Sequence, residues 1–266
     1  MNQDTNQLLY LVCNIALNAG NKILKYFNTD YKIIKKKDNS PLTSADLESN
    51  KVIINELSKI YTNVPILSEE SIIDWSSRKK WNKFWLVDPL DGTKEFINQS
   101  AEFTVNIALI ENNKPILGVI YAPALSKIYY AAKNFGSFKL IVDKRLDNLE
   151  ESISIKAQNK NPKDDLIIVK SRSHSYLKDE FDLWLKQFSN YSFKIRGSSL
   201  KFCDIAEGSA DLYPRFGPTS EWDIAAGDII VSEAGGNLKN LKEEDIYYNK
   251  ESIINPNFVA SCRLSN

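Results

Sequence analysis

Apolar residues recur at helical spacing near the start of the chain. Between Leu8 and Phe27 they lie three or four positions apart, which predicts an amphipathic opening helix. A second helix is expected to begin near Thr43 and to bury a similar stripe, made of Ile53, Ile54, Leu57 and Ile60. The segment 31–37 between these helices ends in three lysines, which indicates a solvated strand end.

Longer apolar runs then predict strands. Phe84–Val87 is uninterrupted and rich in residues that favour strands, so a buried strand is expected there, with Asp88 at its exit from the core. The runs 103–111 and 115–122 predict two strands joined by a hairpin turn at Asn112-Asn113. A third strand at 127–132 extends this meander.

From Leu166 the pattern changes to alternating strands and helices. The predicted elements are strands at 166–169 and 191–195 and helices at 176–188, 200–207 and 224–234. A charged, asparagine-containing stretch at 147–164 separates the two regions. We therefore predict a mixed α/β protein that forms a single unit over 1–266, with lobe one at 1–155 and lobe two at 156–266.

Composition narrows the class of protein. The 266 residues are 43% hydrophobic and 26% charged with a formal net charge of zero, which argues against a nucleic-acid partner held by bulk charge. The three cysteines have no metal-ligand spacing and indicate buried thiols in a reducing compartment. With no signal peptide and no membrane span, we expect a cytoplasmic protein. Loose peripheral association with the cytoplasmic side of the inner membrane stays open, as does the oligomeric state.

Several carboxylates stand at the ends of predicted elements. Asp88 and Asp91 flank a proline turn, Glu69 follows a predicted strand at 64–67, and Asp223 begins the helix at 224–234. Asp46 fits a capping box with Thr43. Each acid has a local explanation as a turn, cap or dipole residue. Taken together, acids from separate elements could converge on a Mg²⁺ site.

The residues after Asp91 add an anion site. Gly92 allows close backbone approach, Thr93 can orient a water, and Lys94 can pair with a phosphate oxygen. Metal and anion sites side by side indicate phosphoryl chemistry. With His174 as the one histidine, activation of water by a metal is the more economical mechanism.

Other phosphate and metal motifs fit less well. An EF-hand loop counted from Asp88 has Thr93 where glycine is needed, and no Walker motif is present. An aspartyl-phosphate mechanism is the serious rival, although the acids of haloacid-dehalogenase-like phosphatases are two residues apart and these are three apart.

Taken together, these residues resemble the inositol monophosphatase superfamily of Mg²⁺-dependent, lithium-sensitive phosphatases. The matching motifs are Leu67-Ser68-Glu69-Glu70-Ser71, Asp88–Thr93 and Trp222-Asp223-Ile224-Ala225-Ala226-Gly227. Within it, the chain most resembles the bacterial 3′(2′),5′-bisphosphate nucleotidases, through the segments 39–43, 85–96, 103–110, 171–174, 197–203 and 213–219. The resemblance covers nearly the whole chain. It implies a layered αβαβα sandwich of the inositol monophosphatase and fructose-1,6-bisphosphatase type, with two packed lobes.

The resemblance also implies roles for individual residues. The ligands of two or three Mg²⁺ would be the Leu90 carbonyl and the side chains of Glu69, Asp88, Asp91 and Asp223. Thr93, held by Asp46, would orient the attacking water. The scissile phosphate would lie among the metal ligands Glu69, Asp91 and Asp223 and meet Gly92, Thr93 and Lys94. Ser198 and Lys201 would hold a second phosphate, and His174 and Arg215 would line the nucleoside side.

The implied reaction is Mg²⁺-dependent hydrolysis of adenosine 3′,5′-bisphosphate to AMP and phosphate, with a place in sulfur assimilation. Other readings stay open: a sugar or inositol phosphatase of the same superfamily, phosphoadenylyl sulfate as a further substrate, or a nucleotide-binding sensor without turnover. Local readings of the second-phosphate residues also stay open. Ser198 and Ser199 can cap the helix that begins at Leu200, Lys201 can be solvated, and His174 can close a loop.

Overall fold

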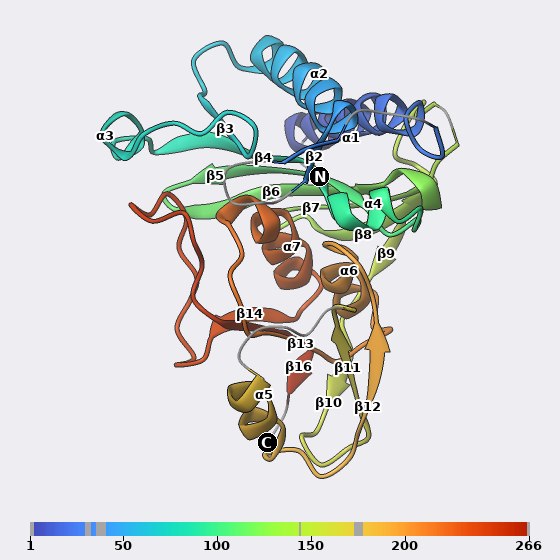
Figure 1. The fold of residues 1–266 in the computed structure, drawn as a ribbon, viewed down its shortest axis with the longest axis vertical. Helices are drawn as coiled ribbons and strands as arrows, with labels where there is room; N and C mark the ends of the chain where they lie inside the picture. The colour runs from blue at the N-terminus through green and yellow to red at the C-terminus, as the bar shows by residue number, and fades with distance from the viewer. Residues whose placement is uncertain (1–2, 30–32, 36–40, 144, 173–177, 265–266) are drawn as a thin grey trace.

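Five layers alternate between helices and sheets in the computed structural model (Figure 1). The structure describes residues 3–29, 33–35, 41–143, 145–172 and 178–264. A seven-stranded sheet lies below α1 and α2, and α6 and α7 separate it from a five-stranded sheet, whose outer face carries α5 (Figure 1). This arrangement confirms the expected mixed α/β sandwich.

The helices of the described chain vary from one turn to six. Their bounds are α1 Gln3–Leu24, α2 Ser44–Ile60, α3 Trp75–Arg78, α4 Thr93–Ile97, α5 Lys178–Leu185, α6 Leu200–Ala206 and α7 Glu221–Glu233, with a 3₁₀ turn at Pro123–Leu125. Both predicted N-terminal helices are confirmed. α2 begins where the capping box at Thr43 predicts, and it buries Ile53 and Leu57 fully.

The strands form two main sheets and two small pairs. Their bounds are β1 Ile33–Lys35, β2 Pro41–Thr43, β3 Ile66–Ser68, β4 Lys83–Asp91, β5 Thr104–Glu111, β6 Lys114–Ala122, β7 Lys127–Ala132, β8 Gly136–Ile141, β9 Ile153–Ile155, β10 Asn159–Lys160, β11 Leu166–Lys170, β12 Tyr191–Ile195, β13 Leu212–Arg215, β14 Asn237–Asn240, β15 Phe258–Ser261 and β16 Arg263–Leu264. The large sheet has the order β3-β4-β5-β6-β7-β8-β9, and the smaller one the order β12-β11-β13-β15-β14.

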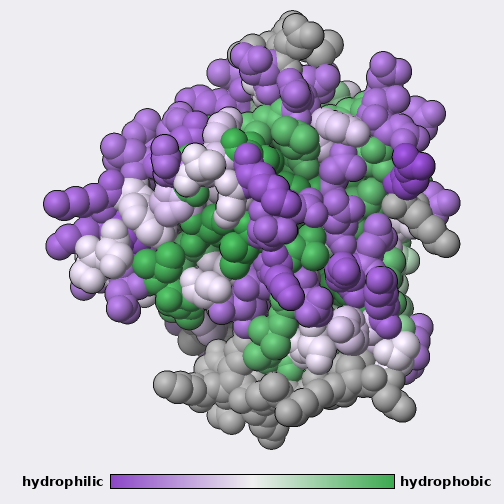
Figure 2. Space-filling model, turned by 90° about the horizontal axis from the view of Figure 1, so that it is seen from above, coloured by the Kyte–Doolittle hydropathy of each residue, from purple (hydrophilic) through white to green (hydrophobic). Residues whose placement is uncertain are grey.

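Strand β4 shows why the strands of the large sheet have continuous runs of apolar residues. Its Trp85 and Val87 pack into the core under α1 and α2, whereas Phe84 and Leu86 pack into the core around α6 and α7. Because both faces of the sheet are covered, the strand has no polar face to alternate with. Seen from above, the outer face over α1 and α2 mixes hydrophilic and hydrophobic side chains (Figure 2).

The meander after β4 follows the sequence pattern closely. β5 and β6 meet at Asn112 and Asn113, which both have positive φ, as a tight hairpin turn requires. β7 has the predicted bounds. β8 and β9, which complete this sheet, were not predicted, because their residues are partly exposed and carry no clear alternation.

One prediction about β4 was wrong. The strand does not end before Asp88 but runs to Asp91, and Asp88 is 1% exposed. The pairing with β5 shifts between Asp88 and Asp91, so β4 carries one residue more than its partner there. Ser49 of α2 donates a hydrogen bond to the Pro89 carbonyl inside this bulge, at 2.7 Å.

The second sheet follows the predicted alternation. β12 has the predicted bounds, and α6 ends within one residue of its predicted end. α5 occupies the middle of the helix expected at 176–188, whose first two residues lie outside the described ones. The strands of the large sheet come from 66–155 and those of the smaller sheet from 166–261. The division into lobes at 155/156 stays our proposal.

No described helix combines the length and apolar character that a membrane crossing needs.

The contact between β6 and α7 gives a first prediction. A Cβ added to Gly118 would lie 2.4 Å from Ile229 Cγ2 and 2.7 Å from the Ala226 carbonyl oxygen. The backbone of α7 cannot withdraw easily, so Gly118→Ala should lower the free energy of unfolding by about 1–3 kcal/mol. Urea unfolding measures this. Lys133→Ala, at an exposed turn, is the control and should change stability by less than about 0.5 kcal/mol. Equal stability of the two variants would contradict the tight packing.

Asp228 in α7 gives a pH prediction. Burial raises the pKa of its carboxyl to about 6, against the opposing hydrogen bond that Tyr248 donates at 2.8 Å. A carboxyl group whose pKa is raised by folding stabilises the native state below its pKa in the unfolded chain, about 3.9. That stabilisation is lost as the pH rises through about 6.

Wild type should therefore lose about 1–3 kcal/mol relative to Asp228→Asn between roughly pH 4 and pH 7. Chemical denaturation of both proteins across this range measures the difference. A constant difference would show that Asp228 does not titrate in this window.

Candidate active site

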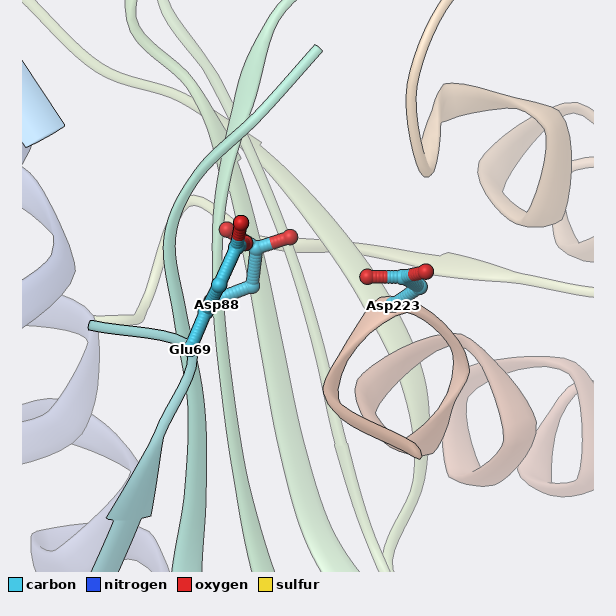
Figure 3. Close-up of side chains that lie close together, drawn as sticks. All are labelled: Glu69, Asp88 and Asp223. Carbon is cyan, nitrogen blue, oxygen red and sulfur yellow. The ribbon is translucent and has the colours of Figure 1, made fainter. Parts of the chain in front are cut away.

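Three carboxylates meet between the two sheets. Glu69, Asp88 and Asp223 each place an oxygen within 4.8 Å of the others (Figure 3). Figure 3 shows Glu69 and Asp88 side by side, facing Asp223 at the start of α7. The first two are neighbours because β3 pairs in parallel with β4, with Ser68 beside Val87, so the next residues are Glu69 and Asp88.

Asp223 is held by the start of its own helix. Ser220 and Asp223 form a capping box in which the Ser220 backbone N–H donates to Asp223 Oδ2 at 2.8 Å. The α7 backbone is thereby capped while the same carboxylate faces Glu69 and Asp88. The local explanation of this acid as a helix residue is therefore correct, and it does not compete with a place in the site.

Burial and mutual repulsion disfavour charge on these acids. Desolvation, followed by the charges of Glu69, Asp91 and Asp223, raises the pKa of Asp88 well above its ordinary value. Desolvation, followed by Asp91 and Glu69, likewise raises the pKa of Asp223. A bound cation would reverse both effects. The donor atoms are all carboxylate oxygens, which fit a hard divalent ion such as Mg²⁺, Mn²⁺ or Ca²⁺.

Asp91 lies beside this cluster rather than within it. Its charge raises the pKa of both Asp88 and Asp223, so it is electrostatically part of the site. Its Oδ2 accepts hydrogen bonds from Ser198 and Ser199, each at 2.7 Å. Those two residues immediately precede α6, so Asp91 is a point where the two sheets are tied together.

A second capping box supports Thr93. Asp46 Oδ2 accepts from the Thr43 backbone N–H at 2.8 Å, and Asp46 Oδ1 accepts from Thr93 Oγ1 at 3.2 Å. The Thr93 hydroxyl also lies 3.3 Å from the Leu90 carbonyl oxygen. The structure thus places the Thr93 hydroxyl against both Asp46 and the Leu90 carbonyl, and Asp46 serves both as cap and as partner of Thr93.

A cavity of about 200 Å³ opens beside Asp91 and Asp223. Of the predicted residues, it is lined by Asp91, Gly92, Lys94, Ser198, Lys201, Arg215 and Asp223. It therefore joins the acid cluster to the segment that was predicted to hold a second phosphate.

Lys201 is buried in the wall of this cavity. It is 5% exposed, its Nζ donates to the Ser198 carbonyl at 2.5 Å, and it lies 5.2 Å from the centre of the Tyr213 ring. Desolvation, followed by the charge of Arg215, lowers the pKa of Lys201 to about 8. The reading of Lys201 as a solvated first-turn residue was wrong, because α6 is buried along its whole length. The reading of Ser198 and Ser199 as side-chain caps was also wrong, since their hydroxyls donate to Asp91.

Arg215 reaches the far side of the cavity. Its guanidinium donates to Ser171 Oγ at 3.5 Å and to the Pro218 carbonyl at 3.2 Å. Its Nε is buried, with no hydrogen-bond partner among the described residues. His174 lies outside the described residues, so its predicted place on the nucleoside side stays a prediction.

Sequence reasoning missed some residues of the cavity wall. Glu95 and Tyr213 line it, and burial raises the pKa of both side chains. Glu95 lies in the first turn of α4, where an acidic residue is already explained by the helix dipole, so the sequence alone did not indicate it. Tyr213 follows a strand pattern and gave no signal either.

Comparison with known proteins gives consistent results. The model of the inositol monophosphatase family matches residues 4–264. The chain is 42% identical over 254 residues to the 3′(2′),5′-bisphosphate nucleotidase CysQ of Salmonella typhimurium, covering 94% of this chain and 98% of that protein. It is 41% identical to the corresponding protein of Escherichia coli, over 96% of this chain and 99% of the relative.

Solved structures agree with the fold. The crystal structure of CysQ from Bacteroides thetaiotaomicron superposes with a TM-score of 0.86 and 38% identity, covering 98% of each chain. The inositol monophosphatase of Thermotoga maritima superposes with a TM-score of 0.76 at 24% identity, over 93% of this chain and 89% of that one, and shows the fold alone.

The acid cluster predicts opposite effects of one substitution with and without metal. Asp88→Asn removes a carboxyl whose ionised form is disfavoured by burial and by the charges of Glu69, Asp91 and Asp223, so the metal-free protein should unfold at a higher temperature at neutral pH. The same change removes a ligand, so the stabilisation by added Mg²⁺ should largely disappear. Thermal unfolding in EDTA and in excess Mg²⁺ measures both effects. Asp179→Asn, on the exposed surface of α5, should behave as wild type. Unchanged stabilisation of Asp88→Asn by Mg²⁺ would place the cation elsewhere.

Proposed function

Because the chain belongs to the inositol monophosphatase family, we propose that it is a Mg²⁺-dependent 3′(2′),5′-bisphosphate nucleotidase that converts adenosine 3′,5′-bisphosphate to AMP and phosphate. The relatives at 42% and 41% identity carry that activity in their names. The three free, buried cysteines are consistent with work in a reducing cytoplasm.

The buried Lys201 is the observation that carries the choice of substrate. A cation 95% removed from solvent needs an anion, and Lys201 faces the same cavity as Lys94 and Arg215. A nucleotide with two phosphates would meet positive charge at both. An inositol monophosphate would leave Lys201 only its protein neighbours, the charges of Asp91 and Glu95 and the Ser198 carbonyl, and would bring no second anion to it.

The protein groups divide the work of hydrolysis. Bound Mg²⁺ would supply a more acidic water and neutralise charge on the phosphate. Glu69, Asp88, Asp91 and Asp223 would hold the cations, with the Leu90 carbonyl. Thr93 donates a hydrogen bond to Asp46, which leaves its oxygen lone pairs to accept a hydrogen bond from the attacking water and orient that water in line with the bond that breaks.

The remaining groups hold the substrate. The scissile phosphate would lie among Glu69, Asp91 and Asp223 and meet the Gly92 turn, the Thr93 amide and Lys94. Gly92 has φ 85°, which lets the backbone turn sharply into α4. The second phosphate would meet Lys201 beside Ser198, with Arg215 and His174 towards the nucleoside.

A covalent aspartyl-phosphate is less consistent with the geometry. Asp88 is 1% exposed, and an oxygen of Asp91 accepts two serine hydroxyls. Neither carboxylate is both accessible and free of hydrogen bonds, as a nucleophile should be, so direct attack by water is the simpler mechanism.

The substrate assignment predicts a clear order of rates. With Mg²⁺, phosphate release from adenosine 3′,5′-bisphosphate should be at least about 100-fold faster, as kcat/KM, than from inositol monophosphate. Lys201→Met should raise the KM for the bisphosphate by about tenfold or more and affect p-nitrophenyl phosphate far less, because that compound has no second phosphate. Lys186→Met, on the exposed surface, is the control. A preference for inositol monophosphate would overturn the assignment, and nucleotide binding without phosphate release would indicate a sensor.

A further inference from the structure

Two serine hydroxyls converge on a single oxygen of Asp91. Ser198 Oγ and Ser199 Oγ each lie 2.7 Å from Asp91 Oδ2, although the serines belong to the segment before α6 and the aspartate to the end of β4. A carboxylate only accepts hydrogen bonds, so both hydroxyls donate to it. Neither serine acts as a side-chain cap for α6.

The neighbours of the serines reinforce that direction. Asn106 Nδ2 donates to Ser199 Oγ at 2.8 Å, so the Ser199 proton is left for Asp91 Oδ2 or for the Asp223 carbonyl at 3.1 Å. Thr104 Oγ1 lies 2.5 Å from Ser198 Oγ and 3.0 Å from Asn106 Oδ1, so its one proton has two acceptors, and the direction of the Ser198 hydroxyl follows from Asp91, which only accepts. Thr104 and Asn106 are adjacent to β4 in β5, so both hydroxyls are oriented by the same sheet that carries Asp91.

The backbone of the serine segment is also fixed. Glu102 accepts a hydrogen bond from the Gly197 N–H at 2.8 Å and forms an ion pair with Arg196 at 3.1 Å. Lys201 Nζ donates to the Ser198 carbonyl. Ser198 itself has φ 54°, a left-handed conformation that costs a serine about 1 kcal/mol. A strained residue is thus held where its hydroxyl reaches Asp91.

We propose that Ser198 and Ser199 are positioning residues that fix Asp91 for cation binding, and so couple the nucleotide pocket to the metal centre. The inference rests on the proposed function, in which Asp91 is a metal ligand. Two hydrogen bonds to Oδ2 set the rotation of the carboxylate and direct Oδ1 away from the serines. The Ser198 hydroxyl thus donates its hydrogen bond to Asp91, and the side chain that would contact a second phosphate is Lys201.

Substitutions can separate this role from a merely structural one. Ser198→Gly removes the hydroxyl but relieves the left-handed strain, so the metal-free protein should be as stable as wild type or more so. Its affinity for Mg²⁺, measured by calorimetry without nucleotide, should nevertheless fall about 3- to 10-fold. Ser198→Gly with Ser199→Ala should lose about tenfold or more, and Ser199→Thr, which keeps the hydroxyl, should restore most of the Ser199 share.

Two controls sharpen the test. Ser171→Ala changes a serine of the same cavity that does not contact Asp91, so its Mg²⁺ affinity should equal that of wild type. In an Asp91→Asn background the two serine substitutions should have little further effect on Mg²⁺ affinity, because they act through that carboxylate.

The outcomes distinguish this inference from the proposed function. If adenosine bisphosphate is hydrolysed but the double serine variant binds Mg²⁺ as wild type does, the positioning role is wrong and the function stands. A raised KM for the nucleotide with unchanged Mg²⁺ affinity would make Ser198 a phosphate ligand instead. If Mg²⁺ affinity depends on the serines while no nucleotide is hydrolysed, the positioning role holds and the proposed function fails.

Discussion

Repulsion among closely spaced carboxylates is the constraint on which the rest of the site depends. Asp88 is buried and Glu69 and Asp223 are partly buried, and at this separation each raises the cost of ionising the next. The fold tolerates this arrangement because each acid is placed by a separate rigid feature: the pairing of β3 with β4, the bulge in β4, and the capping box of α7. A cation turns that electrostatic cost into binding energy, so the same geometry is unfavourable alone and favourable with metal.

Much of the fold could be predicted because its core elements have one clear periodicity. The helical stripe before Phe27, the apolar run at 84–87 and the Asn112-Asn113 turn each specify one local structure. The last two strands of the large sheet, β8 and β9, could not be predicted, since their partly exposed residues show no strict alternation. The extension of β4 past Pro89 was also missed, because a bulge depends on the pairing register with β5 and leaves no local signal.

The site divides in the same way. Motif spacing and resemblance indicated the acids, and the structure brings Glu69, Asp88 and Asp223 together while setting Asp91 beside them. The sequence could not reveal which helix-capping residues also contact the site and which residues before a helix do not cap it. Asp46 and Asp223 each belong to a capping box and also contact Thr93 or face the other carboxylates, whereas Ser198 and Ser199 precede a helix but make no side-chain cap hydrogen bond. The burial of Lys201 likewise depends on the packing of α6 between two sheets, which no short window of sequence records.

The position of Asp223 at the start of α7 has a consequence for how the protein is made. Helix α7 packs against both sheets, so its first turn reaches the other acids only when strands from both halves of the chain are in place. Glu69 and Asp88 leave the ribosome well before Asp223. During synthesis the chain therefore lacks the third carboxylate until α7 has been made, and the three oxygens can meet only once both sheets cover that helix.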